Sequence, residues 1–304
     1  MPLVRLDGRS VIEVAGSDAE HLLQNIVTTD LAALPEGVAK PGALLTPQGK
    51  ILFDFLVWRT GPESFALECR ADVADDFARR LTMYKLRAKA EITKRDQGVA
   101  AVSWRDDSGA SQSDSTASGT GSVSSSIDST AAAGGRDARF ADALDVRRLW
   151  GDFSDDDGAA DDWTRLRIRH GVAESGTDYE LGDAFPHDVL LDQNGGVGFR
   201  KGCFVGQEVV SRMQHRGTAR RRILIVEADS DLPPTGTPVL IEGRPVGSLG
   251  TVLGQEGLAL VRIDKVKDAM DAGQSIIASD VALRLSIPPG MSFSFPQTPS
   301  GEDA

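Results

Sequence analysis

Short apolar runs separated by turn residues fill the first hundred positions, which predicts strands joined by tight turns. Two stretches instead space their apolar residues three or four apart, as in an amphipathic helix. One covers residues 72–87, and the other follows Ser17 and ends near Thr28. Ser17 and Glu20 have the spacing of a capping box, so we expect the helix to start there. The predicted strands lie at 11–15, 64–68, 91–93 and 99–104, and on both sides of a Pro-Gln-Gly-Lys turn within 42–58.

A different pattern begins near residue 219, where short apolar runs recur about every ten residues with Gly and Pro between them. This spacing predicts a small β-barrel at 219–288. Residues 1–218 mix predicted helices and strands, which gives an α+β fold class, and 289–304 are expected to form a flexible tail. Residues 106–139 contain almost no large apolar side chain. Such a segment buries too little surface to offset the lost chain entropy, so we expect a disordered insertion.

Composition narrows the classes of function. The chain has 304 residues, enough for about two domains, and 40% of them are hydrophobic. Its net charge of −12 argues against DNA binding, broad RNA binding and anionic membranes. No apolar run approaches the ~20 residues of a membrane span. The N-terminus has no signal-peptide pattern, and only two cysteines occur, so we expect a cytoplasmic protein in a reducing compartment.

The most informative stretch for chemistry is residues 200–208, which contain one cysteine, Cys203. Arg200 and Lys201 precede it, two glycines bracket it, and a helix-like run follows. Nearby positive charge and a helix N-terminus both lower the pKa of a thiol, so Cys203 is a candidate nucleophile or metal ligand. A buried structural cysteine in a tight turn is an equally open reading. The other cysteine, Cys69, ends an apolar strand and is expected in the core.

A second candidate is Asp54, which interrupts an otherwise apolar predicted strand. A carboxylate in such a strand must be hydrogen-bonded, paired or functional, because burying it alone is costly. It either pairs within the sheet or points into a ligand cavity.

The run Lys201–Glu208, KGCFVGQE, resembles the K-G-C-[FY]-x-G-Q-E motif of the YgfZ family. The stretches RHGVAE, FPHD and HRG occur around it in the same order as in that family, so the resemblance covers most of the chain outside 106–139. These are folate-binding-type proteins of iron–sulfur cluster assembly, related in fold to the glycine-cleavage T-protein, an aminomethyltransferase. The chain is most similar to the mitochondrial-type branch.

The resemblance implies two folate-binding lobes followed by a small β-barrel, and a role in the assembly or repair of 4Fe–4S clusters. Cys203 would act as a thiolate or share a cluster with cysteines of a carrier or scaffold protein, since two cysteines alone cannot hold one. Lys201 would favour the charged thiol and is assigned with Cys203 to the catalytic group. The implied cofactor is tetrahydrofolate, and the residues assigned to bind it are Asp54, Arg87, Gln207 and Glu208.

The chain departs from the T-protein pattern at two places. T-proteins have two consecutive aspartates where this chain has Phe53 and Asp54, and Arg169 aligns with their pterin-contacting glutamate. A tetrahydrofolate-dependent aminomethyltransferase or demethylase, with Asp54 holding the substrate amine, is therefore the alternative function.

Two further patterns in the sequence have more than one interpretation. The arginines at 216 and 220–222 could contact an acidic partner or RNA, although a solvated strand entry is the simpler reading and the acidic balance disfavours RNA. His187 and His215 could carry protons or bind a ligand, but isolated histidines are more often structural.

Overall fold

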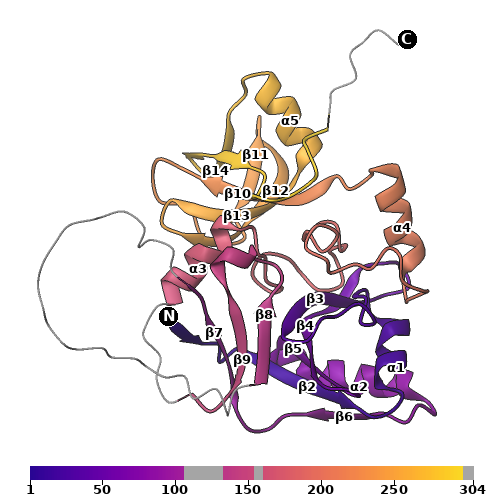
Figure 1. Cartoon of the computed structure of the whole chain (residues 1–304). Helices are drawn as coiled ribbons and strands as arrows, with labels where there is room; N and C mark the ends of the chain where they lie inside the picture. Colours follow the sequence, from indigo (N-terminus) through magenta and orange to yellow (C-terminus); the bar gives the residue numbers. More distant parts are fainter. Residues whose placement is uncertain (106–132, 154–159, 297–304) are drawn as a thin grey trace, which may run out of the picture.

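The computed structural model describes residues 1–105, 133–153 and 160–296. In that part of the chain, a nine-stranded and a seven-stranded β-sheet lie one above the other, with an irregular segment between them (Figure 1). Helices flank the larger sheet, and one further helix stands apart at the edge of the molecule. The arrangement confirms the predicted α+β class with a small C-terminal barrel.

The nine-stranded sheet of the described residues has the order β1-β7-β9-β8-β3-β4-β5-β2-β6. All neighbours are antiparallel except β3 and β8, which run parallel. The strands are β1 (Leu3–Arg5), β2 (Arg9–Ala15), β3 (Val38–Leu45), β4 (Ile51–Gly61), β5 (Ser64–Arg70), β6 (Glu91–Lys94), β7 (Val99–Ser103), β8 (Ala133–Asp137) and β9 (Arg147–Gly151).

Two helices, α1 (Ala19–Ile26) and α2 (Ala74–Lys85), cover one face of β4 and its neighbours. Their apolar faces enter the main core, where Phe77 of α2 stacks on Phe53 with ring centroids 4.9 Å apart. Because successive strand residues point to opposite faces, this placement of Phe53 directs Asp54 to the face away from the helices.

The predicted capping box of the first helix is wrong. The residue before α1 is Asp18, which makes no side-chain cap hydrogen bond. Its carboxylate accepts a hydrogen bond from the backbone N–H of Lys89 at 2.7 Å, and Glu20 pairs with Arg59 at 2.6 Å. The residue before the helix is thus Asp18 and not Ser17, and the Glu20 side chain that local spacing assigned to the cap pairs with a distant arginine instead.

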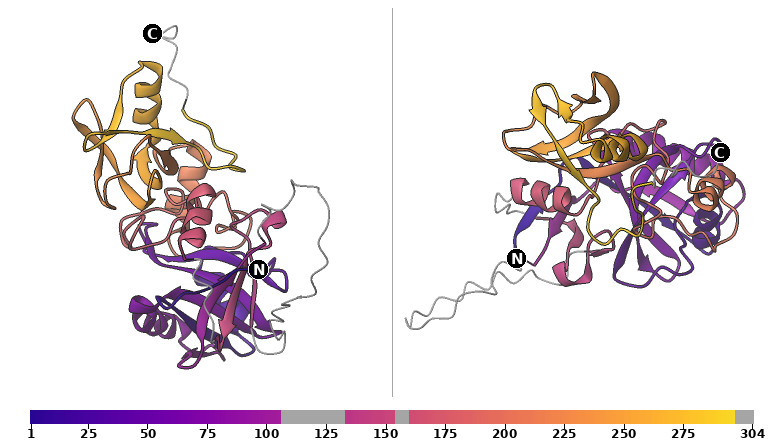
Figure 2. Two further views of the ribbon diagram at one scale, coloured as in Figure 1. Left: turned by 90° about the vertical axis from the view of Figure 1, so that its left-hand side faces the viewer. Right: turned by 90° about the horizontal axis from the view of Figure 1, so that it is seen from above.

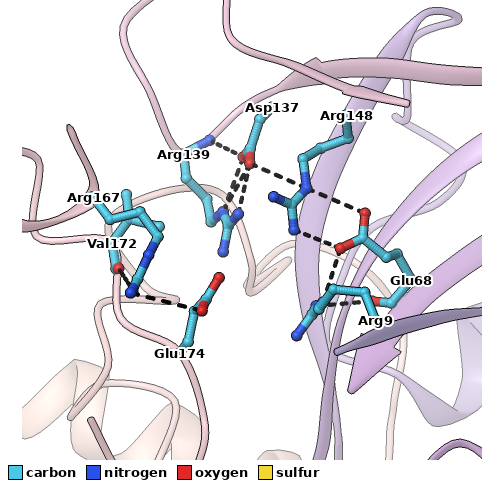
Figure 3. Close-up of polar contacts among 8 residues, drawn as sticks. All are labelled: Arg9, Glu68, Asp137, Arg139, Arg148, Arg167, Val172 and Glu174. Atoms are coloured by element: carbon cyan, nitrogen blue, oxygen red, sulfur yellow. Dashed lines mark hydrogen bonds and ion pairs between the residues drawn. The ribbon is translucent and has the colours of Figure 1, made fainter. Parts of the chain in front are cut away.

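The large sheet curls so that strands from its two halves face each other. Glu68 of β5 and Arg148 of β9 are separated by three strands in the order above, yet their side chains meet at 2.5 and 3.1 Å (Figure 3). Arg9 also donates to Glu68, at 2.9 Å, and Arg139 holds Asp137 through two bonds of 2.6 and 2.9 Å. Burial would raise the pKa of Glu68, but Arg148 and Arg9 hold it below its usual range. We call these five residues the buried ion network.

The predicted disordered insertion, 106–139, is wrong for residues 133–139. These contain β8, which pairs with β9 and β3. The small residues that suggested disorder serve close strand packing, since a Cβ on Gly134 would lie 2.0 Å from the carbonyl oxygen of Arg148. The rest of the predicted insertion, 106–132, lies outside the described residues.

The two sheets are joined through residues 170–206, which contain no helix or strand and follow α3 (Ala160–Arg169). The segment hydrogen-bonds to both sheets. Ala184 accepts from the N–H of Ile51 at 2.8 Å, and Asp188 accepts from the N–H of Ile223 at 2.9 Å. Apolar side chains of the same segment pack on β3 and β4, so it holds the sheets in a fixed relation.

After this segment comes α4 (Gln207–Arg216), and then the described seven-stranded sheet in the order β15-β14-β11-β12-β13-β10-β16. Helix α5 (Ile263–Asp271) contributes its apolar face to the core of this sheet. The strands are β10 (Arg221–Glu227), β11 (Pro238–Ile241), β12 (Arg244–Leu253), β13 (Glu256–Arg262), β14 (Ile276–Ala278), β15 (Val281–Ala282) and β16 (Arg284–Ser286), and the short 3-10 helices of the first region are η1 (Ala71–Val73) and η2 (Asp142–Leu144).

The prediction of a flexible tail is wrong for residues 289–296, which pack on the barrel and on the connecting segment. Phe293 covers the guanidinium of Arg222, 4.7 Å from its ring centroid. The N–H of Ser292 donates to the side chain of Gln193 at 2.9 Å. Residues 297–304 lie outside the described part.

The buried ion network predicts a strong difference between two neighbouring arginines of β9. Arg148→Met should lower the free energy of unfolding by about 3–5 kcal/mol, because it leaves the Glu68 charge buried with one partner fewer. Arg147→Met removes a half-exposed ion pair with Asp145 and should change it by less than ~0.5 kcal/mol. Urea unfolding at pH 7 measures both, and equal losses would contradict the role assigned to the network.

Candidate functional site

The two cysteines have opposite environments. Cys203 is exposed, whereas Cys69 is fully buried in the main core, and burial raises the pKa of its thiol to about 12. The expectation for Cys69 is confirmed, and the buried reading of Cys203 is wrong. Phe204, the next residue, is buried in a core cluster. The phenylalanine therefore anchors the loop, while the thiol of Cys203 is exposed on it.

Lys201 attaches the loop that carries Cys203, residues 198–204, to the end of α1, and we call this segment the cysteine loop. Its side chain is buried, and its ammonium donates to the carbonyl oxygens of Val27 at 2.6 Å and Thr29 at 2.9 Å. Val27 is the residue after α1, so the lysine satisfies one backbone carbonyl at the end of the helix and a second one, of Thr29, in the turn that follows. Burial lowers the pKa of Lys201 to about 8. The ammonium expected to favour the thiolate is thus occupied by backbone carbonyls.

Two glycines and a buried threonine also attach the cysteine loop to the residues after α1. The N–H of Gly198 donates to the carbonyl of Thr28 at 2.8 Å, and the hydroxyl of Thr28 donates to the carbonyl of Gly196 at 2.7 Å. A Cβ on Gly198 would lie 2.9 Å from the side chain of Lys201, so only glycine leaves room for it. Sequence reasoning took Thr28 for an ordinary helix-to-loop residue, although it is fully buried.

Gln207 and Glu208 stand at the first turn of α4. Glu208 is exposed and pairs with Arg212 of the same helix, and Gln207 is half-buried. The turn before them needs Gly206, which has a φ of 77° and lies so close to Thr46 that a Cβ would be 2.5 Å from its carbonyl oxygen.

A small pocket lies between the large sheet and the connecting segment, and Asp54 lines it. The hydroxyl of Ser175 donates to Asp54 at 2.5 Å. The free volume is about 20 Å³, which holds about one or two water molecules. The lining also includes Arg9, Arg139, Tyr179 and Asn194, together with apolar residues of β4 and of the connecting segment.

These residues do not fit tetrahydrofolate. Ligand pockets usually measure about 300–1,000 Å³, and here two arginines of the buried ion network, Arg9 and Arg139, line the space. Of the four residues assigned to bind the cofactor, only Asp54 lines the pocket, while Gln207 and Glu208 belong to α4. Arg87 is exposed beyond the end of α2. Cys203 is also absent from the lining, so pocket and thiol are separate features.

Sequence reasoning missed Glu174, whose carboxylate points among arginines beside the pocket (Figure 3). Arg167 is its nearest ion-pair partner at 3.8 Å. Burial would raise the pKa of Glu174, but Arg167, Arg9 and the other arginines of the network hold it at about 2. The only signal in the sequence was its place in the RHGVAE stretch.

The remaining candidates have structural contacts. Arg169 is exposed and pairs with Glu256 of the barrel at 3.0 Å, so it faces no ligand. His187 is buried 3.2 Å from the side chain of Gln214, and burial lowers its pKa. His215 is exposed on α4. Across the described residues, no three His, Cys, Asp or Glu side chains are grouped to bind a metal.

Comparison with protein families agrees with the two-part architecture. Residues 7–103 match the GCVT N-terminal domain, and residues 220–293 match the family described as "CAF17, C-terminal beta-barrel domain". The crystal structure of glycine cleavage system aminomethyltransferase T from Bartonella henselae superimposes with a TM-score of 0.62 at 14% identity. The match covers 94% of this chain and 84% of that one, and it shows the shared fold alone.

Iron-sulfur cluster assembly factor IBA57, mitochondrial, of Mus musculus is 30% identical over 292 residues, covering 86% of this chain and 78% of the relative. The human protein of the same name is 29% identical over 312 residues, covering 93% and 83%. The chain belongs to the CAF17/IBA57 family. YgfZ is a related bacterial branch, so the predicted family name is corrected to CAF17/IBA57. The comparisons support the predicted likeness to the mitochondrial-type branch.

Membership of the CAF17/IBA57 family overturns the predicted cytoplasmic location, because these relatives are named as mitochondrial proteins. The prediction relied on the low cysteine content, which does not distinguish two reducing compartments, and on the lack of a secretory signal pattern, which concerns export only. No helix in the described residues has the length and apolar character needed to cross a bilayer.

Lys201→Met should detach the cysteine loop, because two buried carbonyls lose their donor. We expect a loss of about 1–3 kcal/mol in unfolding free energy and faster hydrogen exchange in residues 198–204. Arg200→Met, at the exposed preceding position, is the matched control and should change neither. Unaltered exchange in Lys201→Met would show that the lysine does not hold the loop.

The low pKa of Glu174 predicts acid sensitivity. Because its folded value, about 2, lies below the ordinary 4.5, the stabilisation is complete above about pH 4.5 and disappears as the pH falls towards 2. Glu174→Gln should therefore be roughly 1–3 kcal/mol less stable than the parent at pH 7, with the difference shrinking below pH 4.5. Glu180→Gln, at an exposed position, should match the parent throughout. A pH-independent difference would refute the electrostatic explanation.

Proposed function

We propose that this chain is an accessory factor for the assembly or repair of iron–sulfur clusters, with Cys203 supplying one thiolate to a cluster shared with a partner protein. The observation that carries the proposal is an exposed cysteine on a loop that Lys201 fastens to the carbonyls after α1. The names of the CAF17/IBA57 relatives support the assembly role.

The number of cysteine ligands that a cluster needs implies that this chain shares the cluster with a partner protein. An iron–sulfur cluster usually takes four cysteine ligands, and this chain has two cysteines. Cys69 is fully buried, and the high pKa of its thiol disfavours the thiolate that binds iron. The remaining ligands would therefore come from a carrier or scaffold protein, and the cluster is cargo that passes between the two.

The proposal does not use tetrahydrofolate, because the pocket around Asp54 does not fit a pterin. No observation favours the aminomethyltransferase alternative either. Phe53, at the position of the first T-protein aspartate, is packed on Phe77 in the core. Asp54 remains alone and is bonded to Ser175, so the pair of carboxylates is missing.

Anaerobic cluster reconstitution with an iron–sulfur carrier protein tests the shared thiolate. Cys203→Ser should reduce the transfer of a 4Fe–4S cluster to an apo-enzyme at least tenfold, because serine is a poor ligand for iron. Cys69→Ala is the control and should transfer at the parent rate. Adding tetrahydrofolate should alter neither rate. Full transfer by Cys203→Ser would remove the thiol from the mechanism, and strong stimulation by tetrahydrofolate would restore the cofactor.

A further inference from the structure

Arginines without a carboxylate partner gather around the cysteine loop and α4. Arg200, Arg216 and Arg220 are exposed, and none of them pairs with an acidic side chain of the described residues. Their neighbours Arg221 and Arg222 are held by internal carboxylates. Within the predicted arginine cluster, Arg221 and Arg222 are therefore paired with carboxylates of this chain, whereas Arg216 and Arg220 are exposed and unpaired.

This distribution is unusual for so acidic a chain. It has 45 acidic residues against 33 lysines and arginines, and most of the described arginines are paired with a carboxylate. Elsewhere in the described part, the arginines without such a partner are scattered over α2, its end and β12, at positions 80, 87 and 244. The group of unpaired positive charges around the cysteine loop and α4 is thus a local feature of this region of the chain.

The unpaired arginines and the thiol belong to one continuous stretch of chain, made of the cysteine loop, α4 and the four residues after it. Helix α4 has ten residues and is about 15 Å long, with Cys203 four residues before it and Arg216 at its end. A protein interface of about 800 Å² per partner spans that length. Val210 is the one buried side chain of α4, and the helix lies at the edge of the molecule in Figure 1 and in the right-hand view of Figure 2. The exposed side chains of α4 are Glu208, Arg212, Gln214, His215 and Arg216.

We infer that the cysteine loop and the outer face of α4 form a cationic docking face for an acidic protein surface that carries the other cluster ligands. The inference rests on the proposed function and specifies the chemistry of its partner. Cysteine ligands bind as thiolates, so a partner that presents them brings negative charge to the contact. The net charge of −12 repels an acidic partner from the rest of this chain, so the unpaired arginines determine where it lands.

A nucleic acid fits this face less well than a protein. Single-stranded nucleic acids stack chiefly on exposed aromatic side chains, and α4 has no Phe, Tyr or Trp, while Phe204 beside the thiol is buried. Three unpaired arginines are also few compared with the roughly 6–10 phosphate contacts of typical binders. The one acidic residue of α4, Glu208, is neutralised by Arg212.

A charge-reversal experiment tests the docking face. The probe is a fluorescent decaglutamate peptide, titrated by anisotropy at 25 and 150 mM NaCl. Arg216→Glu with Arg220→Glu should weaken binding at least tenfold at low salt. Arg80→Glu with Arg87→Glu changes the net charge equally on and just beyond α2, and should stay within twofold of the parent. Equal weakening by both pairs would show a bulk charge effect and overturn the inference.

One further measurement separates docking from cluster transfer, and two others decide between possible occupants of the face. Cys203→Ser should bind the peptide normally while losing cluster transfer, which separates docking from the proposed chemistry. If an oligouridylate binds tighter than the peptide and is lost in Arg216→Glu with Arg220→Glu, the face belongs to a nucleic acid. If the parent dimerises in sedimentation and that variant does not, the face belongs to a second copy of this chain. Either of the last two results would overturn the acidic-partner assignment.

Discussion

The ion pair between Glu68 and Arg148 is the contact on which this structure depends. It joins strands that are not neighbours in the large sheet and so closes the curl that brings β5 opposite β9. Two charges this deeply buried are tolerated only because further groups satisfy them, and Arg9 and the Asp137–Arg139 pair supply that. Two of these side chains, Arg9 and Arg139, also line the small pocket around Asp54.

This arrangement separates two features that the family resemblance had combined. The pocket around Asp54 belongs to the buried ion network and holds little more than water. The cysteine loop is attached elsewhere, at the end of α1, where Lys201 satisfies backbone carbonyls. A fold that resembles an aminomethyltransferase is thus compatible with a function that uses its surface, because a fold positions sites without dictating their chemistry.

The contrast between Asp54 and Glu68 shows where sequence reasoning stopped. Both are carboxylates within apolar strands, yet only Asp54 was singled out, because it interrupts a long apolar run and also falls in a family pattern. The partner of Glu68 lies 80 positions away, beyond a segment that looked disordered from its composition. Strand β8 was missed for the same reason, since its glycines permit close strand packing that composition cannot reveal. Local capping failed similarly, because Glu20 found Arg59 across the fold.

The sequence by itself determined the α+β class, the C-terminal barrel and the candidate cysteine, because periodicity, turn residues and a contiguous motif are local properties of the chain. Only the tertiary structure decided that Cys203 is exposed, that Lys201 anchors its loop and that the pocket is too small for a pterin. It also decided which arginines remain unpaired. These properties depend on which side chains meet across the fold, and pairing between distant residues leaves no trace in the spacing of neighbours.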